Sequence, residues 1–278
     1  MSMPEMGEQK ALAKFREVME AHKEMSRGVS DKQLSLLQKA YAAYEHEFRQ
    51  HEKKYTSVSS GGAPSVKQLL REIGALASDA CFRGAVGSWE VGQIRPKIPL
   101  LLARVSVLFS LYQTQLIRLD NLTVREVGEI SAIRPHIMQV LGLLSLLGLT
   151  SLDASSRVAN QIAQVLTGQG KSWVLVLLAS LFALTGKDVV ILCHNEDLTK
   201  RDSKASSPFL ALLGHADVKL GAIRYQTYFD MCFDMLKAVD PQGKEHDIVT
   251  KEGSLIDQVL KDTSRASTLR DLRNKQLA

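Results

Sequence analysis

The glycine-rich stretch Val165–Ser172, with the sequence VLTGQGKS, holds the residue types that bind phosphate groups. Two glycines allow a tight turn whose N–H groups face inward, and a helix that starts directly after the turn adds the positive end of its dipole. The lysine would reach the β- and γ-phosphates of a nucleotide, and the serine hydroxyl would hold Mg²⁺. The residues predicted to form this site are Thr167, Gly168, Gln169, Gly170, Lys171 and Ser172.

The motif G-x-G-K-S departs from the common phosphate-loop pattern at its first position. That pattern begins with a small residue, whereas this sequence has the branched Val165. The context favours phosphate binding because the loop follows a predicted strand and opens a predicted helix. An ordinary glycine turn with an exposed Lys171 is the alternative interpretation.

Hydrolysis requires an acidic residue that orients Mg²⁺ and the attacking water, and the sequence offers no recognisable motif for it. The run Val189–Asp197, VVILCHNED, resembles an apolar strand followed by acids, but the acids come three residues late. The pattern D-E-x-D does not occur. Because water-orienting groups contribute roughly 10²–10⁴ in rate, the sequence predicts nucleotide binding with little turnover, and no catalytic residue is assigned.

The elements around the glycine turn follow the order of a βαβ unit. The apolar pattern predicts a strand at 161–166, a helix at 171–184 that ends at Gly186, and a strand at 188–193. The last of these is continuously apolar, which is typical of a strand covered on both faces. Beyond it the pattern predicts a helix at 208–213, a strand at 218–223 and a helix at 228–239.

The upstream sequence has helical spacing throughout. A helix at 8–26 is followed by a second one, for which Ser30 and Gln33 form a capping box. The second helix carries an apolar stripe, which would dock on the rest of the chain or on a partner helix. The Ser- and Gly-rich residues 55–65 predict a linker. Further helices are predicted at 66–80, 98–119, 123–133 (capped by Thr123) and 137–147.

Composition narrows the class of protein. The chain has 278 residues, a net charge of +5 and three widely separated cysteines without a C-x-x-C pair, which argues against a zinc site or a disulfide framework. The longest apolar stretch, Ile98–Leu116, contains Arg104 and fits a buried helix better than a membrane span. With no secretory leader and no basic stripe for nucleic acid, we expect a cytoplasmic protein. Its mildly basic charge leaves peripheral membrane contact open.

Several segments resemble the SecA preprotein translocase motors. Gln161–Trp173, QIAQVLTGQGKSW, is similar to the first nucleotide-binding motif of that family, which also has an apolar residue at the position of Val165. The resemblance covers roughly residues 123–230. The other similar segments are ALTGKDVV at 183–190, the residues Asn195, Leu198, Arg201 and Asp202, PFLALLG at 208–214, and Arg134–Pro135 with Gln139.

This resemblance implies a DEAD-like helicase domain that binds ATP and Mg²⁺ and acts in protein transport, with a polypeptide substrate or protein partner. By that resemblance Gln139 contacts the adenine edge, and Arg134 faces the base or the phosphates. The implied fold is α/β: a helical N-terminal region and a partial RecA-like phosphate-loop domain with a short parallel sheet flanked by helices. The expected organisation is a helical hairpin at 1–54, a linker at 55–65, a helical region at 66–121, a SecA-like nucleotide-binding domain at 122–240 and a polar tail at 241–278.

The sequence leaves two questions open: what form of motor this chain is, and whether it has a different function. The chain would be the front part of a motor, either as a short form, a fragment or an inactive relative. Alternatively, its helices form a protein-interaction module and the nucleotide site is a degenerate scaffold. A phosphate-loop kinase for small molecules is disfavoured, because the Gln139 element and the run 195–202 have no place in one.

Overall fold

The computed structural model describes residues 10, 13–17, 30–56, 65–83, 89–118, 122–124, 133–159, 163, 165, 168 and 170–231. Most of the predicted helix at 8–26, the predicted strand at 161–166 and the predicted polar tail lie outside these residues. The helices are α2 (Asp31–Thr56), α3 (Val66–Ala77), α4 (Ala80–Arg83), α5 (Val91–Ile94), α6 (Ile98–Gln113), α7 (Ile137–Leu146), α8 (Lys171–Leu184) and α9 (Glu196–Leu213), and the strands are β1 (Ile117–Arg118), β2 (Thr123–Val124), β3 (Val189–Cys193) and β4 (Ile223–Thr227).

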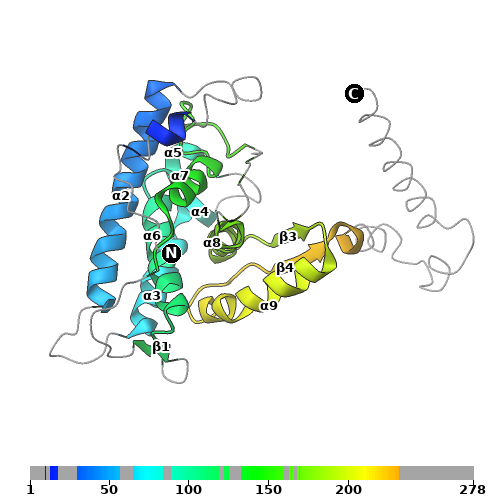
Figure 1. The fold of residues 1–278 in the computed structure, drawn as a ribbon. Coiled ribbons are helices and arrows are strands. Elements are labelled where there is room, and N and C mark those ends of the chain that lie inside the picture. Colours follow the sequence, from blue (N-terminus) through cyan, green and yellow to red (C-terminus); the bar gives the residue numbers. More distant parts are fainter. Residues whose placement is uncertain are drawn as a thin grey trace, which may run out of the picture. The chain divides into compact units, whose positions relative to one another are not determined.

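Helix α6 lies at the centre of the helical packing. It contacts α2 and α3 as well as α8, and α8 in turn contacts α9 (Figure 1). Buried side chains from all of these helices form one hydrophobic core. The helices upstream of the glycine turn therefore share a core with the elements downstream of it.

The start of α2 confirms the predicted capping box. The backbone N–H of Ser30 donates to Gln33 Oε1 (2.9 Å), and the backbone N–H of Gln33 lies 3.3 Å from Ser30 Oγ. The apolar stripe of α2 faces α6 and α7, so this seam is covered by its own chain. Its buried members are Leu37, Tyr41, Tyr44 and Phe48.

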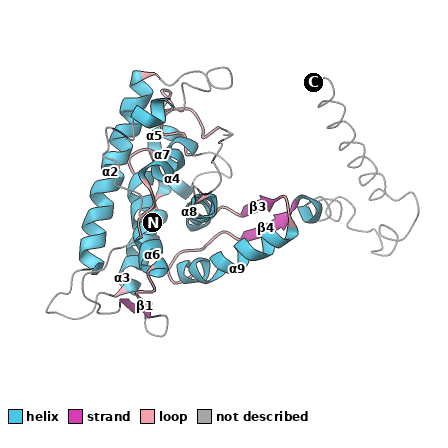
Figure 2. Ribbon diagram, viewed as in Figure 1, coloured by secondary structure: helices cyan, strands magenta, loops and turns pink. Residues whose placement is uncertain are grey.

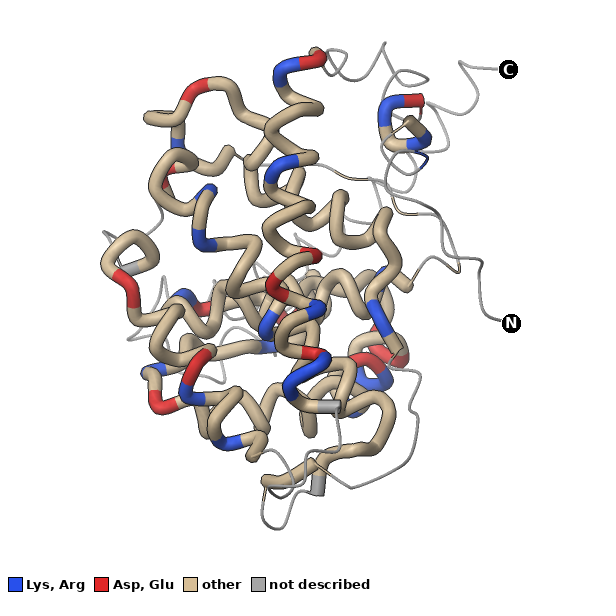
Figure 3. The backbone as a smooth tube through the Cα atoms, turned by 90° about the vertical axis from the view of Figure 1, so that its left-hand side faces the viewer, with Lys and Arg blue, Asp and Glu red and all other residues tan. Residues whose placement is uncertain are grey.

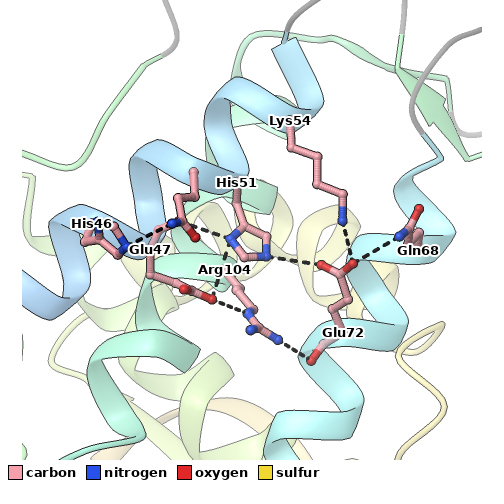
Figure 4. Close-up of polar contacts among 8 residues, drawn as sticks. His46, Glu47, His51, Lys54, Gln68, Glu72 and Arg104 are labelled. Atoms are coloured by element: carbon pink, nitrogen blue, oxygen red, sulfur yellow. Dashed lines mark hydrogen bonds and ion pairs between the residues drawn. The ribbon is translucent and has the colours of Figure 1, made fainter. Parts of the chain in front are cut away.

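A polar network joins α2, α3 and α6 inside this helical region (Figure 4). Arg104 of α6 donates to Glu47 Oε1 (2.7 Å) and to the backbone carbonyl of Glu72 (3.0 Å). The Glu72 carboxylate also accepts from Lys54 Nζ (2.6 Å) and lies 3.1 Å from His51 Nε2. These bonds explain how an arginine is accommodated in the apolar helix α6, which is a core helix as predicted.

Basic and acidic residues are interspersed along the described backbone (Figure 3). Many of them pair with a neighbour on the same helix or on an adjacent element, as in the ion pairs Arg49–Glu45 and Lys97–Asp79. Exposed pairs of this kind contribute about 0–1 kcal/mol each to stability. The packing of the described residues therefore depends chiefly on their apolar core.

Two predicted helices differ from the structure around residues 114–124. Helix α6 ends at Gln113, where Gln115 takes a positive φ of 55°. Residues 117–118 then pair antiparallel with 123–124, with Ile117 opposite Val124. The prediction of a helix that starts at Thr123 is therefore wrong at its first two residues, because strand pairing with β1 replaces the helical cap; residues 125–132 lie outside the described part.

Strands β3 and β4 pair with each other and run in the same direction, with α9 as the connection between them (Figure 2). The chain is thus mostly helical with a small parallel sheet. The predicted strand at 218–223 is wrong in position. Gly221 donates its N–H to the carbonyl of Ala183 at the end of α8 (2.8 Å), and pairing with β3 starts where Val189 donates to Ala222 (2.7 Å).

Strand β3 is located as predicted but is not covered on both faces by the described residues. Ile191 is buried, whereas Val190 is 40% exposed. Helix α9 is also longer than the predicted 208–213. It begins at Glu196, capped by Asn195 Oδ1, which accepts from Asp197 N (2.7 Å), and it continues through Pro208 to Leu213.

Chain contacts divide the molecule into residues 1–225 and 226–278. Of the second unit the structure describes residues 226–231. There Thr227 and Asp230 bond to each other: Thr227 Oγ1 donates to Asp230 Oδ2 (2.7 Å), and Asp230 N donates to Thr227 Oγ1 (3.1 Å). Of the predicted helix at 228–239, the structure describes residues 228–231, which are helical.

Candidate nucleotide-binding site

Two glycines of the turn before α8 have left-handed backbone conformations in the described part of the chain. Gly168 and Gly170 have positive φ values of 82° and 70°, a conformation that residues with a side chain avoid. Gly170 is the N-cap of α8; it has no side chain to cap the helix, and its carbonyl accepts from Trp173 N (3.0 Å). The predicted site residues Thr167 and Gln169 lie outside the described residues.

Helix α8 is anchored at both ends by aromatic contacts. At its start the ring of Trp173 meets Phe109 of α6 edge-on, with ring centroids 5.0 Å apart. Near its end Phe182 stacks on Trp89 at 4.8 Å. Helix α8 ends at Leu184, and the predicted stop residue Gly186 follows with a φ of 83° and its N–H bonded to the Ala183 carbonyl (2.9 Å). The turn is thus attached to a fixed helix.

The structure brings Gln139 to the glycine turn. An added Cβ at Gly170 would lie within 3.0 Å of Gln139 Nε2, which shows how closely the amide approaches the turn. Gln139 is held by the capping box of α7: its Oε1 accepts from His136 N (2.8 Å), and His136 Nδ1 accepts from Met138 N (3.2 Å). The starts of α7 and α8 therefore meet at Gly170.

Lys171 and Ser172 occupy the first two positions of α8. The Lys171 side chain is exposed, and Ser172 is partly buried. The Ser172 hydroxyl lies 3.4 Å from Asp202 Oδ2 on α9. Asp202 Oδ1 accepts from both Nε (2.9 Å) and Nη2 (2.8 Å) of Arg201. Asp202 therefore has two contacts: it pairs with Arg201, and its other oxygen faces Ser172 of the glycine turn.

Arg134, which the resemblance places at the nucleotide, contacts helix α2 instead. Its guanidinium forms an ion pair with Glu52 of α2 and lies over the ring of Phe48, 5.3 Å from the centroid. In this arrangement it ties the segment before α7 to α2, and Gln139 is the member of the predicted Arg134–Gln139 pair that reaches the glycine turn.

The residues present fit a nucleotide phosphate with Mg²⁺. Among the described residues, no atom lies within 4 Å of a Cβ added at Gly168. Ser172 and Asp202 supply oxygen atoms, which Mg²⁺ prefers as ligands. Among the described residues no group of three or more His, Cys, Asp or Glu could hold a metal by itself.

The sequence assigns Asp202 no contact with the glycine turn. The signal that could have assigned it a further role is its position one strand after the G-K-S motif, on the helix that follows β3. A parallel strand–helix–strand unit brings such a helix beside the loop helix. The contact itself joins residues 30 positions apart, so no local pattern reveals it.

Comparison with known proteins agrees with this geometry. The sequence profile of the SecA DEAD-like domain family matches residues 2–228. The chain belongs to that family. The resemblance at residues 123–230 is confirmed, and the SecA DEAD-like match extends it upstream through the helical region. A DEAD-like domain of this kind is associated in general with nucleotide and Mg²⁺.

A curated relative shares a shorter part of the SecA DEAD-like chain. The protein translocase subunit SecA of Diacronema lutheri is 37% identical over 100 residues, which are 34% of this chain and 10% of that relative. The chain therefore matches about a tenth of the relative's length. In the described part of the chain, no helix combines the length and apolar character that crossing a bilayer demands.

Proposed function

We propose that the chain binds ATP with Mg²⁺ at the junction of α7 and α8 and serves a motor of the protein-translocation type. The single observation that supports this most is the approach of the Gln139 amide to Gly170, the N-cap of α8. An amide can donate and accept at once, as an adenine edge requires. The glycine turn and the helix start offer N–H groups to phosphate oxygens.

The proposed roles follow from position. Residues 167–172 would surround the phosphates, Lys171 would contact the β- and γ-phosphates, and Ser172 would hold the metal. Gln139 would contact the base. The parallel pair β3–β4 with α8 and α9 is the described part of a partial RecA-like domain in this proposal, and residues 122–240 form its nucleotide-binding unit.

Hydrolysis by the chain alone is proposed to be weak. A bound metal would neutralise phosphate charge, but orientation of the attacking water needs a further acidic or amide group. Within the described residues, Asp202 is the carboxylate that contacts Ser172, and it is held by Arg201 rather than aimed at a water. We expect steady-state turnover below about 1 s⁻¹, the low end of the enzyme range. We expect the chain to act in the cytoplasm on a polypeptide substrate or with a protein partner of a translocation system.

Isothermal titration calorimetry with ATP and excess MgCl₂ tests the proposal. Lys171→Ala removes the exposed cation at the start of α8 and should abolish binding without loss of fold. Lys204→Ala, which removes an exposed lysine from α9, is the matched control and should bind as the wild type. Saturation near 100 times Kd should stabilise the wild type by about 2.7 kcal/mol. If ATP neither binds nor raises the melting temperature, the proposed function is refuted.

A further inference from the structure

Asp202 lies in an unusual place for a charged residue on the outside of a helix. Its side chain is 19% exposed, although its partner Arg201 is 66% exposed. The carboxylate faces inward to Ser172, with 3.4 Å between Ser172 Oγ and Asp202 Oδ2. A surface ion pair between adjacent residues does not need this partly buried position.

The two oxygens of this carboxylate have different partners. Oδ1 accepts two hydrogen bonds from the Arg201 guanidinium, at 2.9 and 2.8 Å. Oδ2 is directed at the Ser172 hydroxyl. A forked arginine fixes the plane of a carboxylate, so Arg201 holds the second oxygen in its direction toward the start of α8.

The backbone behind Asp202 is also held. Ser206 Oγ lies 2.8 Å from the Asp202 carbonyl oxygen and 2.9 Å from the hydroxyl of Tyr225 on β4. Burial raises the pKa of Tyr225, and the nearby charge of Asp202 raises it further against the lowering effect of the Ser206 hydrogen bond. The phenol is therefore neutral at physiological pH and adds no second negative charge beside the carboxylate.

Ser172 and Asp202 together have the donor chemistry of a Mg²⁺ site. In phosphate-loop proteins the metal is held by the loop serine or threonine and by a carboxylate from another element, next to the nucleotide phosphates. Here the carboxylate beside the loop serine comes from α9. A serine–carboxylate contact of 3.4 Å is long for a hydrogen bond, and a cation bound between the two oxygens would replace it.

We propose that Asp202 and Ser172 form the protein part of a divalent-cation site, with Asp202 as an acidic ligand supplied by α9. This inference rests on the proposed ATP site, because the phosphates complete the coordination. Arg201 is a positioning residue in it. The proposal also joins two elements: the cation would link the start of α8 to the first half of α9.

Calorimetric titration of the full chain with ATP, in excess MgCl₂ and in EDTA, measures how much the metal contributes. Wild type should bind ATP more tightly with MgCl₂. Asp202→Asn keeps the size of the side chain but removes its charge, and it should lose about tenfold or more of that Mg²⁺-dependent gain. Its affinity in EDTA should match the wild type. Glu196→Gln, which removes an exposed carboxylate from the same helix, is the control and should keep the full gain.

The outcomes separate this inference from the proposed function. If wild type binds no ATP under either condition, the proposed function fails. If wild type binds ATP and Asp202→Asn retains the whole Mg²⁺-dependent gain, Asp202 is not a ligand and the inference is overturned. Asp202→Glu restores a carboxylate and should recover part of the Mg²⁺-dependent gain. A merely structural role of Asp202 does not predict this recovery.

A second measurement needs no variant and so does not depend on the variants folding. Fe²⁺ replaces Mg²⁺ in the wild-type chain with ATP, and ascorbate with hydrogen peroxide then cleaves the backbone close to the bound iron. Peptide mapping should show ATP-dependent cleavage near both Ser172 and Asp202. Cleavage near Ser172 alone, with none around Asp202, would contradict the proposed ligand set.

Discussion

Substitution of Gly170 by alanine tests the junction between α7 and α8 directly. The substitution has two separate costs. The first is conformational, because the φ of 70° is left-handed and costs an alanine about 1–2 kcal/mol. The second is steric, because the new Cβ would lie within 3.0 Å of Gln139 Nε2. The amide would have to leave, and its hydrogen bond from His136 N, worth about 1 kcal/mol, would be lost.

The free energy of unfolding should therefore fall by about 2–3 kcal/mol in Gly170→Ala. Gly168→Ala is the matched control. Its φ of 82° carries the same conformational cost, but its Cβ would meet no atom of the described residues within 4 Å. We expect it to lose only about 1–2 kcal/mol. Any gain from a stiffer unfolded chain is common to both variants and cancels in the comparison.

Urea unfolding followed by circular dichroism measures both losses. A double-mutant cycle isolates the steric part: in the Gln139→Ala background, Gly170→Ala should cost about 1 kcal/mol less than in the wild type. Equal losses for Gly168→Ala and Gly170→Ala, together with no coupling to Gln139, would show that the amide does not lie against the turn. The adenine role proposed for Gln139 would then lose its structural support.

Other predictions concern the scaffold. Gly74→Ala should destabilise the protein by about 3 kcal/mol or more despite the higher helix propensity of alanine, because its Cβ would overlap the backbone carbonyl of Ala216. Gly142→Ala lies within α7, and no atom of the described part of the chain lies within 4 Å of its added Cβ, so it should instead stabilise by about 1 kcal/mol in the same urea assay. Burial alone would raise the pKa of Glu72, but its hydrogen bond and charge contact with Lys54 outweigh burial and lower the pKa below the ordinary 4.5. The stability that this carboxylate contributes is present above pH 4.5 and is lost as the pH falls through the folded pKa. Glu72→Gln should therefore flatten the decline of the unfolding free energy at acid pH. An unchanged slope would contradict this prediction.

The helices that sequence patterns predicted well are those with a long apolar face and a clear stop or start. Helix α8 ends where Gly186 supplies a left-handed residue, and α2 starts at the capping box of Ser30. These signals are local, so the sequence carries them. The short strands are different, because a two-residue strand such as β2 exists only through its partner β1.

The candidate site shows the same division. The glycine turn could be located from its residues, and family resemblance indicated Gln139. The partners of Arg134 and Ser172 could not be predicted from the sequence, because each contact joins distant positions. Glu52 precedes Arg134 by 82 residues, and Asp202 follows Ser172 by 30. Such contacts are set by how α2, α8 and α9 pack, and that packing depends on the whole core.

The aromatic anchors of α8 give the protein a built-in optical probe. The chain has two tryptophans, and both report on this helix: Trp173 sits in its first turn against Phe109, and Trp89 stacks on Phe182 near its end. Indole emission therefore arises solely from the two ends of the element that begins with Lys171. Steady-state fluorescence can follow any tilt or loosening of α8 without a chemical label, and single replacements of either indole would assign the signal to one end.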